Sequence, residues 1–131
     1  MAQDFGTLLM FEGKAEEAMN FYVSLFKDGK VIDIQRYGSG EMGSEGSIKV
    51  AKFMLGTQRM SCIDSPVHHQ FTFTPSISIV VDCGDEAELD SLFEQLSANG
   101  HVLMPAANYG FSQRFGWVTD RFGVSWQLSL E

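Results

Sequence analysis

The chain repeats itself at an offset of 71 residues, and this repeat limits the folds open to it. The segment Phe11–Val31 (FEGKAEEAMNFYVSLFKDGKV) aligns without a gap on Asp82–Val102 (DCGDEAELDSLFEQLSANGHV), and Gly29 coincides with Gly100. Two copies of a unit that cannot bury its apolar face alone pack on each other. We therefore expect two similar modules that share a cleft, and the functional question is which side chains line it.

Composition narrows the class of protein. With 131 residues, 44% of them hydrophobic, the chain is expected to form one globular domain. No run reaches the roughly 18 apolar residues of a membrane span, and the N-terminal MAQDFG lacks the features of a signal peptide. We expect a cytoplasmic protein with no membrane partner and with its two cysteines reduced. A net charge of -8 without a basic cluster argues against a nucleic-acid partner.

The first copy predicts a strand, a helix and three strands. Apolar residues recur at helical spacing between Lys14 and Lys27, and Asp28-Gly29 supplies the stop. The predicted strands are Thr7–Phe11, Val31–Tyr37, Ser47–Leu55 and Arg59–Asp64, the last two forming a hairpin at Gly56.

The second copy predicts the same order. A strand over Ser76–Val81 precedes a helix that begins with a capping box at Asp85 and Glu88 and ends at Asn99-Gly100. Further strands are predicted over about His101–Met104, Gln113–Thr119 and Val124–Leu130. Module one then spans about residues 5–64, the linker 65–75 and module two about 76–130.

Strand alternation predicts which side chains face the cleft, because successive residues point to opposite faces of a sheet. Apolar rows such as that of Trp126 and Leu128 are expected to pack against the helices. The opposite, concave face is predicted to carry Thr7, Leu9, Phe11, Ser76, Ser78, Ser125, Gln127 and Ser129. Aligning Gly56 with Gly123 gives an offset of 67, which places Met60 opposite Gln127, Cys62 opposite Ser129 and Asp64 on the same face as Cys62.

The order of these elements, closed by TDRFGVSWQL, resembles the vicinal oxygen chelate superfamily, which includes glyoxalase I, bleomycin and fosfomycin resistance proteins and extradiol dioxygenases. The AEEAMNFYVSLF stretch, the Arg36–Gly38 RYG and the QRFGWVTDRFGVSWQL ending are most similar to its PhnB-like branch, which has carried the label 3-demethylubiquinone-9 3-methyltransferase. The resemblance implies an α+β fold of two βαβββ modules forming a cupped mixed sheet, usually in a homodimer.

In catalytic members the resemblance implies a divalent metal in the cup, held by His and Glu residues. Carried over one by one, the ligand positions fall on Thr7, on Ser76 or Ser78, on Gln127 and on Met60. None of these is an imidazole or a carboxylate, the groups that divalent cations require. We therefore expect neither a metal at these positions nor another cofactor. A displaced site built from Cys62, Asp64, His68 and His69 is the alternative.

Several further side chains are candidates for contact with a ligand. Gln127 is a long polar side chain on the inner face that can both donate and accept. Trp117 and Tyr109 could stack on a planar ligand or serve as core or interface aromatics. Arg114 could bind a carboxylate or phosphonate, or form a salt bridge with Asp120 that holds the hairpin. Cys62 would be a nucleophile only with a depressed pKa, and is otherwise an inert buried thiol.

The sequence thus predicts a PhnB-like protein that binds a small organic molecule without a metal. The alternative is an enzyme of the superfamily, either a metal-dependent isomerase, dioxygenase or transferase, or the methyltransferase of the family label. Methyl transfer from S-adenosylmethionine commonly uses a glycine-rich turn after a strand of a doubly wound sheet, and no segment here has that pattern.

Overall fold

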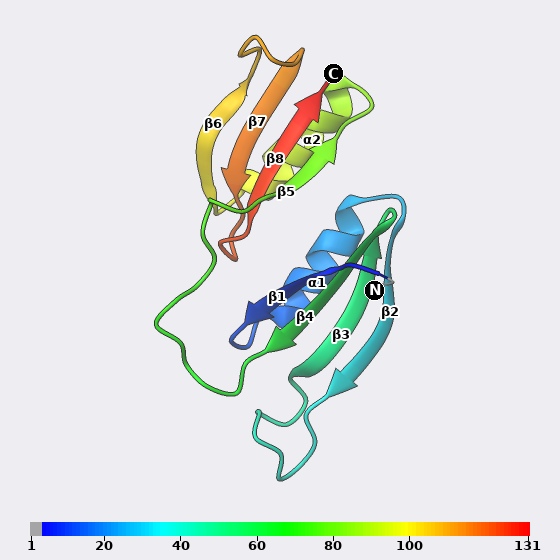
Figure 1. The fold of residues 1–131 in the computed structure, drawn as a ribbon, viewed down its shortest axis with the longest axis vertical. Helices are drawn as coiled ribbons and strands as arrows, with labels where there is room; N and C mark the ends of the chain where they lie inside the picture. The colour runs from blue at the N-terminus through cyan, green and yellow to red at the C-terminus, as the bar shows by residue number, and fades with distance from the viewer. Residues whose placement is uncertain (1–3) are drawn as a thin grey trace. The chain divides into compact units, whose positions relative to one another are not determined.

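The computed structural model describes residues 4–131. The chain divides into two compact units, unit 1 ending at His69 and unit 2 starting at Gln70. Each unit is a strand, a helix and three further strands, with the helix lying against one face of its own sheet (Figure 1). The predicted α+β fold of two βαβββ modules is confirmed.

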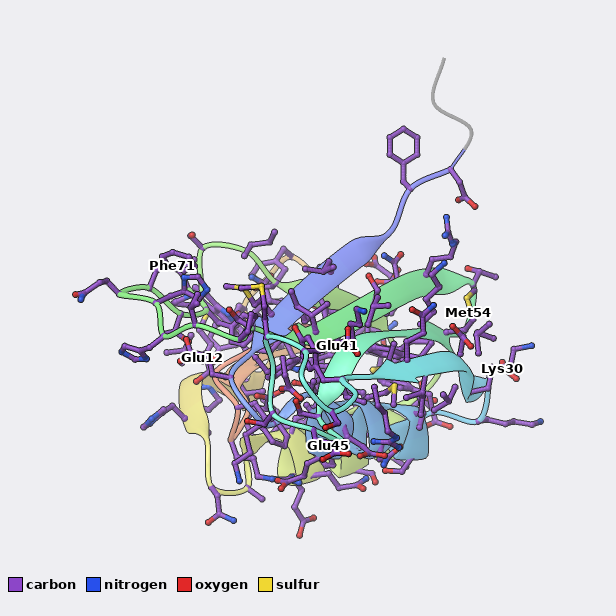
Figure 2. The ribbon with its side chains drawn as sticks, turned by 90° about the horizontal axis from the view of Figure 1, so that it is seen from below. Glu12, Lys30, Glu41, Glu45, Met54 and Phe71 are labelled. Carbon is purple, nitrogen blue, oxygen red and sulfur yellow. The ribbon has the colours of Figure 1, made fainter. Side chains whose placement is uncertain are left out.

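Unit 1 contains β1 (Thr7–Phe11), α1 (Ala15–Leu25), β2 (Gly29–Arg36), β3 (Ile48–Leu55) and β4 (Gln58–Asp64). Its sheet has the order β1-β4-β3-β2, and β1 runs parallel to β4 while the other pairs are antiparallel. Figure 2 shows Lys30 beside Met54 at one end of β2 and β3, as their register requires, and Glu41 and Glu45 on the loop between the two strands. The sheet is therefore mixed, with its first strand at one edge.

Unit 2 repeats this topology with β5 (Ile79–Asp82), α2 (Glu86–Ser97), β6 (His101–Ala107), β7 (Arg114–Thr119) and β8 (Ser125–Leu130). The order is β5-β8-β7-β6, again with a parallel first pair and antiparallel others. Two strand boundaries of unit 2 differ from prediction by three residues, and its other strand boundaries by at most one. Residues 74–77 form a turn, so β5 begins at Ile79 and Ser76 lies outside the sheet. Strand β6 continues through Pro105, which an edge strand tolerates because its outer amides need no partner.

The two helices begin in different ways. Asp85 caps α2 because its side chain accepts from the amide of Glu88 at 2.8 Å, and the Glu88 side chain accepts from the amide of Gly84 at 2.7 Å. The predicted capping box is therefore present, with its second bond made to the residue before Asp85. The side chain of Lys14, the N-cap residue of α1, makes no such bond. Among the described residues, neither helix is long and apolar enough to cross a membrane.

Glycine is required at the paired positions that follow the helices. A Cβ on Gly29 would lie 2.3 Å from the carbonyl oxygen of Val23, and one on Gly100 would lie 2.1 Å from that of Thr119. Both distances are far shorter than a van der Waals contact. The atoms concerned belong to the backbone, which cannot move aside as a flexible side chain can. Close backbone approach therefore requires glycine at both positions of the repeat, to α1 in unit 1 and to the end of β7 in unit 2.

Candidate functional site

In each sheet, one face is covered by the helix and the other, which we call the open face, is not. In unit 1 the thiol of Cys62 donates to the carbonyl oxygen of Ala15 at 3.8 Å, so its row points at α1. The register aligns Cys62 with Leu9 and Ala51, and all three are buried. The helix-covered row of unit 1 thus contains Thr7, Leu9, Phe11, Met60, Cys62 and Asp64. The prediction that these six side chains face the cleft is wrong.

The error comes from one residue in the hairpin turn. Met54 pairs with Arg59 in unit 1, and Thr119 pairs with Ser125 in unit 2, so the second turn is one residue longer than the first. The correct offset for the last strand is therefore 66, which places Met60 at the position of Trp126 rather than that of Gln127. A slip of one residue moves every side chain of a strand to the opposite face.

With this register, the open face of unit 1 carries side chains that the sequence prediction did not select. Leu8 is 54% exposed and shares a row with Ser61, Lys52 and Asp33. Ser61 stands where Gln127 stands in unit 2. Alternation along β4 could have identified this row, because Met60 and Cys62 are the apolar members and Ser61 is not.

Asp64 organises the starts of two elements in unit 1, α1 and β3, and the loop before α1. Its Oδ1 accepts from the amides of Gly13 at 2.8 Å and Ala15 at 3.0 Å, and its Oδ2 accepts from the amide of Ile48 at 3.0 Å. The carboxylate is buried and supplies the cap that α1 lacks. It is therefore occupied by backbone donors and serves structure rather than ligand binding.

In unit 2 the apolar row of the sheet faces the helix, and Ser76 lies outside the sheet. A Cβ on Gly116 would meet the ring of Phe93 on α2 at 2.6 Å, so the row of Gly116, Val118, Trp126 and Leu128 lies under the helix. The open face consequently carries Trp117, Ser125, Gln127 and Ser129. Ser78, just before β5, reaches the same face because its hydroxyl lies 2.7 Å from that of Ser125.

A chain of hydrogen bonds connects four side chains on this open face. The indole Nε1 of Trp117 donates to Ser125 Oγ at 2.8 Å. Ser125 Oγ lies 2.7 Å from Ser78 Oγ, and Gln127 Nε2 donates to Ser78 Oγ at 3.3 Å. Three of the predicted site residues, Ser78, Trp117 and Gln127, are thus brought together, with Ser125 as the link between them.

An aromatic cluster flanks the hydrogen-bonded chain. The ring of Phe115 packs edge-on against those of Phe111 and Tyr109, with distances between ring centroids of 4.9 Å and 6.2 Å. The Tyr109 hydroxyl donates to the carbonyl of Pro105 at 2.6 Å. Phe115 aligns with Ser129 and lies on the open face. Sequence reasoning selected Tyr109 and missed Phe115, although alternation with Trp117 in the sequence FGW could have found it.

Arg114 is directed at α2 rather than at the open face. Its Nε donates to Asp90 Oδ1 at 2.7 Å, and its Nη1 lies 3.9 Å from Glu86. The hydrogen bond to Asp90 raises the pKa of the guanidinium. The predicted salt bridge with Asp120 is therefore wrong, because Arg114 pairs with carboxylates of α2 and the Asp120 carboxylate accepts from the indole of Trp126 at 2.9 Å.

The residues proposed for a displaced metal site do not converge. His68 Nδ1 lies 2.8 Å from Glu12 Oε1, His69 Nε2 lies 2.8 Å from Ser65 Oγ, and Asp64 is engaged by three amides. Within residues 4–131, no group of three or more His, Cys, Asp or Glu side chains is arranged to hold a metal. The linked side chains on the open face of unit 2 offer amide, hydroxyl and indole groups, a donor set that does not fit a divalent cation.

Both thiols are expected to be unreactive in the native protein. Burial, and then the Asp64 carboxylate, raise the pKa of Cys62 to about 12, and burial raises that of Cys83 to about 11. Neither should react with a disulfide reagent at pH 8 until the chain is unfolded, because the thiolate is the reacting form. Rapid modification of a native thiol, assigned with a Cys62→Ser variant, would contradict this.

The raised pKa values of the two thiols also determine how the stability of the fold changes with pH. A thiol whose pKa is higher in the folded state than its ordinary value of 9.0 holds its proton more tightly when folded. The associated stability is complete below pH 9 and is lost as pH rises toward 12. Urea unfolding of the wild type and of Cys62→Ser between pH 8 and pH 11 measures this contribution.

Comparison with known proteins agrees with the architecture. The family model described as 3-demethylubiquinone-9 3-methyltransferase matches residues 3–129. A solved structure described as a putative 3-demethylubiquinone-9 3-methyltransferase, PhnB protein, from Bacillus cereus is 51% identical, with 98% of this chain and 100% of that chain covered and a TM-score of 0.95. Protein PA1353 from Pseudomonas aeruginosa is 25% identical over 99% of this chain and 98% of its own, with a TM-score of 0.86.

A more distant structure shares the fold alone. The fosfomycin resistance protein FosX from Listeria monocytogenes, solved with Mn(II) and sulfate, is 12% identical over 100% of this chain and 93% of its own, with a TM-score of 0.64. Among curated proteins, none matches the chain. The repeat, the paired βαβββ units and the match over nearly the whole length place this chain in the 3-demethylubiquinone-9 3-methyltransferase, or PhnB-like, family.

Proposed function

We propose that the protein binds a small organic molecule on the open face of unit 2 and that it does so without a divalent metal. The observation that carries the proposal is the hydrogen-bonded chain of Trp117, Ser125, Ser78 and Gln127. The indole of Trp117, the hydroxyl of Ser78 and the amide of Gln127 belong to partly exposed side chains and can orient an organic ligand through stacking and hydrogen bonds. The same groups lack the charge needed to hold a divalent cation.

The methyltransferase in the family's description finds no support in the residues of this chain. The glycine-rich run of residues 38–46 joins two strands of one antiparallel pair, β2 and β3, and does not lead from a strand into a helix. A cofactor-binding turn of the doubly wound type requires that strand-to-helix transition. We therefore base the proposal on the open face and not on the family's description.

The proposal predicts a response to organic compounds and none to metals. In a thermal-shift screen, planar organic compounds that include quinones, phenols and lactams should contain members that raise the melting temperature by several degrees, because a ligand that binds only the native state stabilises it. Mg²⁺, Mn²⁺, Ni²⁺ and Zn²⁺ should leave the melting temperature unchanged, and elemental analysis should find no stoichiometric metal.

Tryptophan fluorescence localises the response. Trp117 lies on the open face, whereas Trp126 is fully buried under α2. A compound that binds as proposed should quench emission in the wild type and much less in Trp117→Phe. Stoichiometric metal, strong stabilisation by one divalent ion, or quenching that persists in Trp117→Phe would each refute the proposal.

A further inference from the structure

The central row of the open face in unit 2 carries no charge. The register aligns Val80, Gln127, Trp117 and Met104 across the four strands. Val80 is 62% exposed, and the other three are partly exposed. In unit 1 the corresponding row is Leu8, Ser61, Lys52 and Asp33, which contains a cation and an anion. The two copies have therefore diverged in charge at equivalent positions, and a neutral ligand matches unit 2.

The hydroxyl protons in the hydrogen-bonded chain can be assigned by counting donors. The indole N–H of Trp117 can only donate, so Ser125 Oγ accepts from it. Ser125 is 2% exposed, and its own proton must find a buried acceptor, for which Ser78 Oγ at 2.7 Å is available. Ser78 Oγ then accepts from Ser125 and from Gln127 Nε2.

This assignment leaves one acceptor, Gln127 Oε1, near two donors, the hydroxyl proton of Ser78 and the second hydrogen of Gln127 Nε2. Ser78 uses both lone pairs of its hydroxyl as acceptors, so its own proton is available to a ligand. Gln127 uses Nε2 in the bond to Ser78, and its Oε1 accepts no hydrogen bond from the residues that the structure describes. Both groups belong to partly exposed side chains: Gln127 is the cross-strand neighbour of Trp117, and Ser78 is linked to the Trp117 indole through Ser125. The face therefore presents an O–H and a C=O next to an aromatic ring.

We propose that this face of unit 2 recognises neutral, planar molecules that carry a donor beside an acceptor, the pattern of a cyclic amide. The ligand N–H would donate to Gln127 Oε1, its carbonyl would accept from the Ser78 hydroxyl, and its ring would lie against Trp117. A carboxylate or phosphonate offers only acceptors to Gln127 Oε1 and finds no cation in the row, since Arg114 points to α2 and is held by Asp90. The inference rests on the proposed function and specifies its ligand class.

The test uses three probes that share one ring system. Isothermal titration of the wild type with 2-quinolinone, N-methyl-2-quinolinone and quinoline-2-carboxylate compares a donor-acceptor pair, the same ring without the donor, and an anion. We expect the Kd of 2-quinolinone to be at least tenfold lower than that of either other probe. Affinities within threefold of one another, preference for the carboxylate, or absence of binding by 2-quinolinone would each overturn the inference.

A matched pair of variants connects the preference to Gln127. Gln127→Leu should lower the affinity for 2-quinolinone at least tenfold and abolish the preference over the N-methyl compound. Gln95→Leu removes an exposed glutamine of α2 whose Nε2 donates to the Ser91 carbonyl and hydroxyl, and it should leave both affinities unchanged. If Gln95→Leu matches the loss in Gln127→Leu, the inference fails. The comparison of the three probes on the wild type tests the inference even if Gln127→Leu folds poorly.

The two proposals can fail separately. If the wider screen yields compounds that quench Trp117 while 2-quinolinone shows no preference over its N-methyl form, the face binds organic ligands and only the ligand class is wrong. If no compound of the screen raises the melting temperature or quenches Trp117, the proposed function itself fails.

Discussion

Replacing Asp64 with asparagine is expected to lower the free energy of unfolding by about 3 kcal/mol. The wild-type carboxylate accepts from three backbone amides, those of Gly13, Ala15 and Ile48. An asparagine can offer only one oxygen, so its NH₂ group must face at least one of the three N–H donors inside the core. Two buried donors then oppose each other, and at least one amide loses its acceptor.

Urea unfolding followed by circular dichroism measures this effect. Asp33→Asn is the matched control, because Asp33 is an exposed carboxylate on β2 of the same unit and should change the free energy by less than about 0.5 kcal/mol. Equal stabilities of the two variants would show that the network around Asp64 contributes nothing beyond a surface charge.

The second large effect is expected at Gly100. In Gly100→Ala the new methyl group would lie 2.1 Å from the carbonyl oxygen of Thr119 and 2.9 Å from the carbonyl carbon of Asp120, so the start of β6 must move away from the end of β7. Overpacking against backbone that cannot rearrange locally should cost about 3 kcal/mol.

Gly84→Ala provides the control for Gly100→Ala. Its Cβ would have only the Glu88 carboxylate oxygen nearby, at 3.8 Å, so the substitution should be tolerated. Thermal unfolding of both variants separates a steric effect from the general consequence of removing a glycine. A Gly100→Ala protein as stable as Gly84→Ala would mean that the backbone can relax at this position.

The repeat was sufficient to predict the architecture because the helix periodicity and the glycines that stop the helices are local signals. The capping box at Asp85 and the stop at Gly100 were identified in this way. The open face of unit 2 was also predictable, because the apolar row of Trp126 and Leu128 alternates cleanly with serines and Gln127.

The open face of unit 1 was not predictable by aligning the two turns. Matching Gly56 to Gly123 ignored one additional residue in the second turn, and that difference of one residue directed Met60, Cys62 and Asp64 to the wrong side. Alternation along a single strand, judged by which row is more apolar, is the safer guide. The partner of Arg114 was also out of reach, since a pairing between a strand and a helix 24 residues away depends on packing.

The two helix caps give the duplicated units different routes to the native state. In unit 2 the cap residue Asp85 and the amide it accepts from are three residues apart, so the start of α2 can form as soon as that stretch of chain exists. In unit 1 the cap comes from Asp64, which is 49 residues from Ala15 in sequence. The start of α1 is therefore secured only when the fourth strand closes the sheet, which makes unit 1 the more cooperative and higher-contact-order half of a protein built by duplication.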